Sequence, residues 1–359
     1  GSLRETQQRA IESIMSGRDT MVIMPTGGGK SITFQVPALA GEGLCIVVTP
    51  LIALMKDQVA NLRSRSIKAA AIYSGMKTAD VIKALENCIF GDYKFLYISP
   101  ERLSSELFLA KIKKVNVRLI TVDEAHCISQ WGHDFRPEYT QLKAIREQFP
   151  QTPIVALTAT ADKITRQDIV KQLALKEPKT FISSFDRPNL SLDVRRGYQQ
   201  KEKTRTILEF IFKRPNECGI IYCMSRDKTE KVCDMLLRHG IKATIYHAGL
   251  SASARDKAQE DFINDRVQVV CATIAFGMGI DKSNVRWVIH YNMPKSIESF
   301  YQEIGRAGRD GVKSDTLLFY SLGDLVMLSK FAIDSGQQAI NLEKLNRMQQ
   351  YAESDICRR

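Results

Sequence analysis

The sequence predicts an α/β protein with two tandem domains, each built on a parallel β-sheet flanked by helices. Its 359 residues are enough for two domains of average size. Short β-branched segments alternate with amphipathic helical segments of about 10–15 residues, which is typical of βαβ units. The alternation pauses at a polar, proline-containing stretch, residues 185–189, and then resumes. We therefore expect the two domains to join near residues 186–200.

Six strands are predicted in the first half of the chain. They are rich in β-branched and aliphatic residues, as expected for a sheet covered on both faces. Segments with apolar residues at i, i+3 and i+4 separate them, for example residues 51–62 and 163–173. The predicted strands are residues 20–24, 44–49, 69–73, 95–98, 119–122 and 154–158.

The second half repeats the pattern and then becomes purely helical at residues 342–352. Its predicted strands are residues 219–223, 243–246, 267–271, 285–290 and 316–320. The predicted domains are residues 1–190 and 191–335, followed by a short helical segment at 336–359.

Composition and charge narrow the class of protein. Apolar residues make up 44% and charged residues 25%, as in globular proteins. The net charge of +11 is spread over the chain, with 25 basic and 19 acidic residues in 1–190 and 26 and 21 in the rest. This distribution predicts a basic face that suits a polyanion, although many basic proteins bind no nucleic acid.

The cysteines and the apolar segments indicate the compartment. The eight cysteines form no CxxC pair and mostly lie in apolar segments, which is typical of a reducing environment. Charge-free stretches reach about 14 residues, short of the roughly 18–20 that span a bilayer. We therefore expect an intracellular protein without a membrane partner, in the cytoplasm or nucleoid of a bacterium or the nucleus of a eukaryote.

A glycine-rich loop follows the first strand and opens a helix. Its sequence, MPTGGGKS at residues 24–31, differs from the strict phosphate-loop pattern, which has glycine in place of Met24. Backbone N–H groups of such a loop surround a triphosphate, Lys30 reaches its terminal oxygens, and the Ser31 hydroxyl binds Mg²⁺. The alternative is a flexible turn. The predicted nucleotide-binding residues are Thr26, Gly27, Gly28, Gly29, Lys30 and Ser31.

Two adjacent acids end the predicted strand at residues 119–122. At the carboxyl edge of a parallel sheet, Asp123 is suited to hold a metal ion, and Glu124 to activate the attacking water. As an isolated tetrapeptide, residues 123–126 would more often be a solvated strand end. For His126, a structural role and a role in coupling are left open.

Positive charge for phosphoryl transfer is predicted in the second half, at residues 302–310. Gln302, Arg306 and Arg309 are the candidates, and the two arginines share a face if the helix continues that far. We expect them to act on the nucleotide across a domain cleft. A surface pair that binds carboxylates is the alternative.

The ordered motifs resemble those of superfamily 2 helicases. They are residues 3–7 (LRETQ), 24–31, 49–55 (TPLIALM), 99–102 (SPER), 123–126 (DEAH), 156–160 (ALTAT), 219–223, 272–281 (ATIAFGMGID) and 302–309 (QEIGRAGR). Residues 127–137 (CISQWGHDFRP) resemble the aromatic-rich loop of the RecQ family. The resemblance implies two RecA-like domains with ATP and Mg²⁺ in their cleft. It also implies a 3′ to 5′ DNA helicase acting on single-stranded and partially duplex DNA in repair and recombination.

The resemblance also implies roles for further residues. Arg4 and Gln7 match the adenine-recognising motif. In the aromatic-rich loop, Trp131 and Phe135 offer flat faces to bases and Arg136 adds charge, although both aromatics could instead be core residues. The hydroxyls of residues 158 and 160 are candidates to link the two domains, or simply to cap a strand end.

By the same resemblance, residues 336–359 are expected to be the beginning of the zinc-binding subdomain that follows the core in this family, and the last three residues look like its opening. Because a structural site needs four ligands and Cys357 supplies one, we expect no structural zinc in this chain. We also expect a monomer. Two other functions stay open: a translocase or RNA-directed remodeller on the same motor, and a nucleotide-binding scaffold that no longer hydrolyses.

Overall fold

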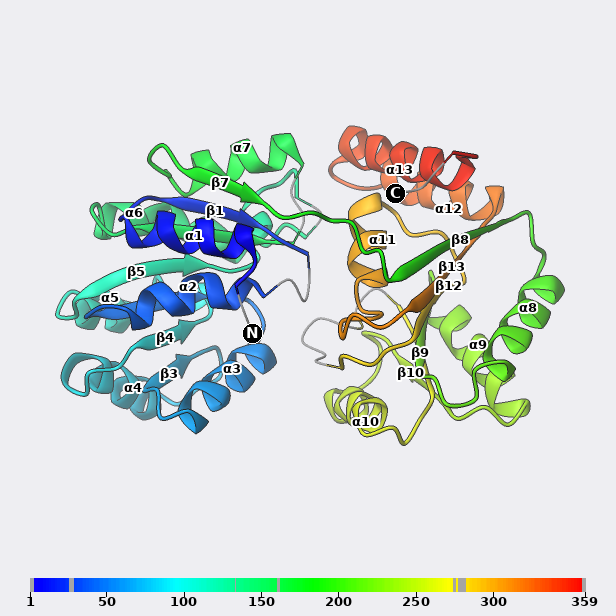
Figure 1. Cartoon of the computed structure of the whole chain (residues 1–359), viewed down its shortest axis with the longest axis horizontal. Coiled ribbons are helices and arrows are strands. Elements are labelled where there is room, and N and C mark those ends of the chain that lie inside the picture. The colour runs from blue at the N-terminus through cyan, green and yellow to red at the C-terminus, as the bar shows by residue number, and fades with distance from the viewer. Residues whose placement is uncertain are drawn as a thin grey trace. The chain divides into compact units, whose positions relative to one another are not determined.

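The computed structural model describes residues 3–25, 29–132, 134–159, 162–273, 276 and 282–356. It divides into two compact units, Gly1–Phe185 and Asp186–Arg359 (Figure 1). The boundary lies within the polar stretch at which the strand and helix alternation pauses. The finer limits at residues 190 and 335 stay predictions.

The first unit is built on a parallel sheet. Over the described residues it has seven strands in the order β3-β4-β2-β5-β6-β1-β7. β6 pairs with both β1 and β5, so the carboxyl ends of these three strands are neighbours. The strands are β1 Thr20–Ile23, β2 Leu44–Val48, β3 Ala69–Ile72, β4 Phe95–Ile98, β5 Val117–Val122, β6 Ile154–Thr158 and β7 Lys179–Ile182.

Helices cover both faces of this sheet. The period of two in a strand sends Met21 and Ile23 into one apolar core and Val22 into the other. α1, α2 and α3 pack on the face of Val22, and α4, α5 and α7 on the face of Met21. The helices are α1 Glu5–Met15, α2 Lys30–Leu39, α3 Ile52–Ser64, α4 Thr78–Phe90, α5 Glu106–Ile112, α6 Ile145–Gln148 and α7 Lys163–Gln172.

The second unit repeats this plan. Its parallel sheet has six strands over the described residues, in the order β10-β11-β9-β12-β13-β8. The strands are β8 Leu190–Arg196, β9 Gly219–Tyr222, β10 Ala243–Tyr246, β11 Val269–Ala272, β12 Trp287–His290 and β13 Ser314–Tyr320. The helices are α8 Gln200–Phe212, α9 Arg226–Arg238, α10 Ala252–Ile263, α11 Ile297–Ile304, α12 Leu322–Ile333 and α13 Gln338–Glu353.

Two apolar cores also hold the second unit together. Trp287 and Ile289 of β12 face α8 and α9, whereas Val288 faces α10 to α13. The C-terminal helix α13 contributes Leu345 and Met348 to the second of these cores, which fixes it to the sheet. The helix predicted at residues 342–352 is therefore part of this unit's packing.

The predicted fold class is confirmed, with two differences in detail. β7 and β8 were not predicted, because they are edge strands that lack a continuous run of buried apolar residues. α11 ends at Ile304, so the helix does not continue through Arg306 and Arg309 as the shared-face expectation required. Over the described residues, the structure contains no helix long and apolar enough to span a membrane.

Candidate functional site

The predicted catalytic residues of the first unit lie at one edge of its sheet. Lys30 follows β1, Asp123 and Glu124 follow β5, and Thr158 ends β6. Since these strands are neighbours in the sheet, their carboxyl ends bring the three sets of side chains together. The spacing between the sets is therefore fixed by strand pairing.

The glycine-rich loop is described from Gly29 onward. Gly29 has a φ of 78° and precedes Lys30, the first residue of α2, so backbone N–H groups at the helix start are available to an anion. The Lys30 ammonium lies 3.4 Å from the Met24 carbonyl oxygen, back across the loop. Ser31 is the second residue of the same helix. The predicted residues Thr26, Gly27 and Gly28 lie outside the described residues.

Gln7 connects the first helix to this loop. Its Nε2 donates to the carbonyl oxygen of Gly29 over 3.3 Å, and its Oε1 accepts from the backbone N–H of Arg4 over 2.9 Å. A Cβ at position 29 would lie 2.5 Å from Gln7 Nε2, so glycine at this position permits the contact. The pair proposed to recognise adenine is thereby placed beside the proposed phosphate loop.

The pKa of the Asp123 carboxyl group is raised by its surroundings. Burial raises its pKa to about 7, the neighbouring Glu124 adds to the rise, and Lys30 and the Glu124 backbone N–H oppose it. The Glu124 N–H donates to Asp123 Oδ1 over 2.9 Å, and the Tyr139 hydroxyl donates to the Asp123 carbonyl oxygen over 2.8 Å. An opposite charge beside this carboxylate would favour its ionised form.

Glu124 sits at a sharp change in chain direction. Its φ of 50° and ψ of 44° are left-handed, a conformation that a residue with a side chain rarely adopts. This turn ends β5 and starts the short 3₁₀ segment Ala125–Ile128. Backbone strain of this kind is concentrated at functional sites.

His126 connects the end of β5 to the end of β6. Its ring is buried, with Nδ1 lying 2.8 Å from Thr158 Oγ1 and 3.4 Å from Glu124 Oε2. The ring therefore touches the proposed base and a hydroxyl of the ALTAT motif within one unit. Sequence analysis did not predict this contact. Thr160, the other hydroxyl of that motif, lies outside the described residues.

The aromatic-rich loop packs directly against His126. A Cβ at Gly132 would lie 2.4 Å from the His126 carbonyl oxygen, so the backbone approach requires glycine. The Ser129 hydroxyl accepts from the Trp131 N–H over 3.2 Å and donates to Asp168 of α7 over 2.6 Å. These contacts hold the start of the loop, while the Trp131 side chain is 43% exposed.

The two other predicted DNA contacts, Phe135 and Arg136, lie further along the loop. Phe135 is half-buried. Arg136 donates from Nε and Nη2 to Asp134 Oδ2, over 3.2 and 3.1 Å, and its N–H donates to the Cys127 carbonyl oxygen. The far end of the loop thus folds back onto the 3₁₀ segment that contains His126.

Two sets of residues could in principle hold a metal ion. Ser31 and Asp123 offer oxygen ligands, which suit Mg²⁺. His126, Cys127 and Asp134 have ligand atoms within 4.8 Å of one another, but Arg136 already neutralises Asp134 and burial raises the pKa of the Cys127 thiol. The second set therefore fits a cation poorly, and the first fits Mg²⁺.

Arg306 and Arg309 lie in the turns that follow α11 in the second unit. The side chain of Arg306 hydrogen-bonds the buried Tyr222, and both arginines oppose the effect of burial, which raises the Tyr222 pKa to about 12. The neighbouring Glu303 pairs with the buried His290 over 2.5 Å. Gln302 is on the last turn of α11.

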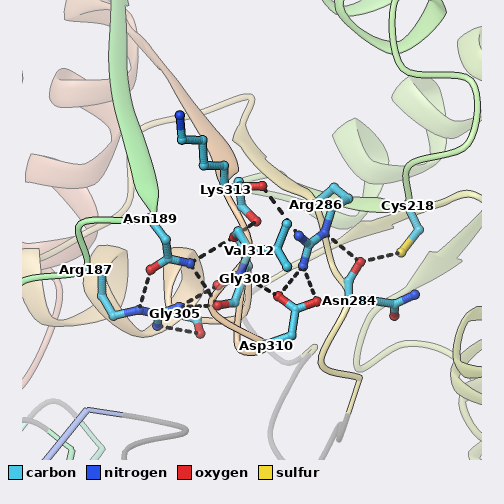
Figure 2. Close-up of polar contacts among 12 residues, drawn as sticks. Arg187, Asn189, Cys218, Asn284, Arg286, Gly305, Gly308, Asp310, Val312 and Lys313 are labelled. Atoms are coloured by element: carbon cyan, nitrogen blue, oxygen red, sulfur yellow. Dashed lines mark hydrogen bonds and ion pairs between the residues drawn. The ribbon is translucent and has the colours of Figure 1, made fainter.

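Sequence analysis missed the residues that hold this arginine-bearing turn. Arg187 and Asn189 bind its carbonyl oxygens, and Arg286 pairs with Asp310 on its other side (Figure 2). The only signal of Arg187 and Asn189 in the sequence was the polar stretch at residues 185–189, which was interpreted as a pause before the second domain. Arg286 lay unnoticed in the strand predicted at residues 285–290.

Comparison with known proteins agrees with this arrangement. The family models "DEAD/DEAH box helicase" and "Helicase conserved C-terminal domain" match residues 4–169 and 202–311. The "ATP-dependent DNA helicase RecQ" of Haemophilus influenzae is 45% identical over 361 residues, covering 100% of this chain and 58% of the relative. The protein of the same name from Pasteurella multocida is 46% identical, covering 100% and 57%.

Solved structures show the same fold. Mycobacterium smegmatis helicase Lhr bound to ssDNA and AMP-PNP has a TM-score of 0.68 and 20% identity, covering 97% of this chain and 48% of that one. Saccharomyces cerevisiae Dbp5 bound to RNA and ADP BeF3 has a TM-score of 0.69 and 18% identity, covering 98% and 88%. At these identities the likeness concerns the fold alone.

The tandem RecA-like fold and the motifs at its strand ends define a superfamily 2 helicase core. The aromatic-rich loop and the relatives narrow the class. The chain belongs to the RecQ family of helicases, and it spans 57–58% of the length of the two curated relatives above.

Proposed function

We propose that this chain is the motor of an ATP-dependent DNA helicase, which couples ATP hydrolysis to 3′ to 5′ movement along single-stranded DNA and to unwinding. The two curated relatives named above support the reaction and the substrate. One observation carries the coupling: the aromatic-rich loop packs on His126, and the His126 ring contacts Glu124. A strand bound to the loop then acts on the catalytic acid through one residue.

The proposed nucleotide site uses the loop and helices of the first unit. Arg4 and Gln7 bind the adenine, while the loop from Thr26 to Gly29 and the ammonium of Lys30 bind the phosphates. Their support is the hydrogen bond from Gln7 to Gly29 and the N–H groups of the first turn of α2, which a helix leaves without an internal partner. The terminal phosphate is then proposed to lie near the ends of β1 and β5.

Hydrolysis is proposed to depend on the two acids. Ser31 and Asp123 would hold Mg²⁺, which neutralises phosphate charge when bound. Glu124 takes a proton from the attacking water, and His126 fixes the orientation of the Glu124 carboxylate. The contact of His126 with Thr158 in turn fixes the imidazole ring.

Gln302, Arg306 and Arg309 are proposed to stabilise the charge that spreads over the transferred phosphoryl oxygens. They belong to a different unit from Lys30 and Glu124. Turnover would then require both units, and each hydrolysis event would change the affinity of one unit for the other. This is the step that we propose drives movement along the strand.

Trp131, Phe135 and Arg136 are proposed to contact single-stranded DNA. Stacking of a base on an aromatic side chain contributes about 1–3 kcal/mol, and the exposure of Trp131 supports this role. We propose that the protein acts as a monomer where cellular DNA lies, in a nucleoid or a nucleus.

Trp131→Ala tests the proposal. We expect ATP affinity to be kept and phosphate release stimulated by single-stranded DNA to fall at least about tenfold, which is the loss of one stacking contact. Phe90→Ala is the matched control, because Phe90 is an exposed aromatic of the same unit, on α4. Equal losses of ATP affinity and DNA stimulation would show that Trp131 is only a packing residue. Equal stimulation by matched RNA would favour an RNA-directed enzyme.

A further inference from the structure

The joining segment between the units makes specific contacts with the turn that carries the two arginines. Arg187 donates from Nη2 to the carbonyl oxygens of Ala307 and Gly308, both over 2.9 Å, and from Nη1 to that of Gly305 over 3.4 Å (Figure 2). One guanidinium thus binds three carbonyl oxygens on both sides of Arg306. Because α11 has already ended, these carbonyl groups follow its last turn and are not part of a continuing helix.

Asn189 adds a second connection two residues later. Its Nδ2 donates to the carbonyl oxygens of Gly308 and Val312, over 2.9 and 3.0 Å, and its own carbonyl oxygen accepts from the Ser314 N–H over 2.8 Å. Its Oδ1 also lies 3.4 Å from Arg187 Nε. Through Asn189, these bonds connect Gly308 to Val312 and Ser314, the two ends of the loop that contains Arg309.

Gly308 shows how tightly the segment fits the turn. It has a φ of 58°, and a Cβ there would lie 2.4 Å from Asn189 Nδ2 and 2.9 Å from the Val312 carbonyl oxygen. The positive φ and the close approach both require glycine. The position between Arg306 and Arg309 is therefore shaped by contact with Asn189.

The opposite side of the turn is held by the unit's own sheet. Asp310 accepts from Arg286 Nη2 over 2.6 and 2.7 Å, and its Oδ1 also accepts from the Val312 N–H over 3.1 Å (Figure 2). The Gly308 N–H donates to Val285, next to β12. Arg309 is thus located between two restraints, one from the joining segment and one from the region of β12.

From these contacts we propose that Arg187 and Asn189 are positioning residues for Arg306 and Arg309. The joining segment would fix the position of the two arginines as well as connect the units. The contacts of Arg187 and Asn189 form a clamp on this turn. Ordering a backbone costs conformational entropy, and the clamp orders the turn before the nucleotide binds. Charge stabilisation is strongest when the donors are held in place beforehand. This inference rests on the proposed catalytic role of the arginines.

Arg187→Ala is the central variant, and Arg187→Lys retains the charge without the planar fork. We expect kcat for DNA-stimulated ATP hydrolysis to fall about 10- to 100-fold for alanine, and less for lysine. KM for ATP and affinity for single-stranded DNA should be kept. Arg214→Ala is the matched control, because its guanidinium also binds a carbonyl oxygen and a carboxylate in the second unit, those of Phe210 and Asp315.

A double-mutant comparison separates positioning from general damage to the fold. Adding Arg187→Ala to the variant that lacks both arginines, Arg306→Ala/Arg309→Ala, should lower kcat no further, because both of the groups that Arg187 positions are already gone. The same fractional loss in both backgrounds, or a loss no larger than that of Arg214→Ala, would overturn the proposal. Asn189→Ala should behave like Arg187→Ala but with a smaller effect.

Hydrogen exchange gives a readout that does not depend on catalysis. In Arg187→Ala, amides of residues 305–314 should exchange faster, while those of β9 and β12 keep their protection. Unchanged hydrogen exchange in residues 305–314 would contradict the proposal that Arg187 holds this turn, even if kcat for ATP hydrolysis fell. If Arg309→Ala itself kept full kcat while the turn loosened in Arg187→Ala, the proposed role of the arginines would be wrong and the contacts of the clamp would stand.

Discussion

The two units hold their functional side chains in different ways. In the first, Lys30, Asp123 and Glu124 directly follow buried strands, and the pairing of β1, β5 and β6 sets the distances among them. In the second, Arg306 and Arg309 lie beyond the end of α11, in a turn bound by Arg187, which comes 118 to 121 residues earlier than the carbonyl groups it contacts. The side chains of the sheet-edge site are placed by the backbone pairing of the strands that they follow, whereas those of the turn depend on hydrogen bonds from remote side chains.

The largest effect is expected at the sheet edge, with Glu124→Gln. Loss of the proposed base should lower kcat by about 10²- to 10⁴-fold while ATP still binds, because the phosphate contacts are unchanged. Single-turnover phosphate release and nucleotide titration measure the two quantities. Glu147→Gln, an exposed position on α6, is the control. A full rate in Glu124→Gln would remove Glu124 from the mechanism.

The turn is tested by Gly308→Ala against Gly311→Ala. Both glycines have positive φ, but a Cβ at Gly311 meets nothing within 4 Å, whereas one at Gly308 meets Asn189 and the Val312 carbonyl oxygen. Both variants carry a backbone strain of about 1–3 kcal/mol. Any additional loss of kcat in Gly308→Ala therefore measures the effect of disturbing the contact with Asn189. We expect kcat to fall about tenfold more for Gly308→Ala. Similar ATPase rates in the two variants would mean that the fit to Asn189 does not matter for catalysis.

A smaller effect is expected within the first unit, with Thr158→Val. This change removes the hydroxyl beside His126 Nδ1 and costs about 1–3 kcal/mol of stability through an unsatisfied buried group. The ratio of DNA-stimulated to basal ATPase should fall severalfold, since His126 also contacts Glu124. Thr152→Val, which loses one hydrogen bond to the Val117 carbonyl oxygen, is the control. If both variants kept the same stimulation ratio, His126 would have a structural role only.

The smallest effect is expected for Asp310→Asn, as a dependence of stability on pH. Burial raises the pKa of Asp310, but hydrogen bonds from Arg286 and the Val312 N–H more than offset this, so the pKa lies below its usual value. Such a carboxyl stabilises the fold above its unfolded pKa, about 4, and loses this effect as the pH falls through the folded value.

Because the pair is partly exposed, we expect Asp310→Asn to lower the free energy of unfolding by less than about 1 kcal/mol at pH 7. The difference from the parent chain should shrink below about pH 4. Denaturant titrations at pH 7 and pH 3 measure it. A difference that stays constant between these pH values would mean that the ion pair does not contribute.

Much of the fold was predictable because buried parallel strands leave a strong pattern. β2, β4 and β6 are fully buried and, apart from Thr158 at the end of β6, apolar or aromatic, and the chain alternates regularly around them. The acids at 123 and 124 were identifiable for the same reason, since they directly follow the buried end of β5. The edge strands β7 and β8 lacked this pattern, because exposed and charged residues interrupt them.

Contacts between remote segments could not be predicted from the sequence. Gln7 and Gly29 are 22 residues apart, and His126 and Thr158 are 32 residues apart, so periodicity carries no information about either pair. The end of α11 was signalled locally by Gly305 and Gly308, because glycine is a weak helix former and Gly308 adopts a φ of 58°, which a helix does not allow. The bonds of Arg187 and Asn189 to the carbonyl groups of this turn left no such local signal.

The close approach of Gly132 to the His126 carbonyl oxygen has a practical consequence for protein engineering. Because its backbone rests on the carbonyl group of His126, the aromatic-rich loop cannot be exchanged for that of another helicase by grafting its tip alone. A transplant would have to include residues 123–137 as one block, together with a partner on α7 equivalent to Asp168. The loop proposed to contact DNA and the two acids proposed for catalysis are therefore expected to be transferred together in chimeric enzymes.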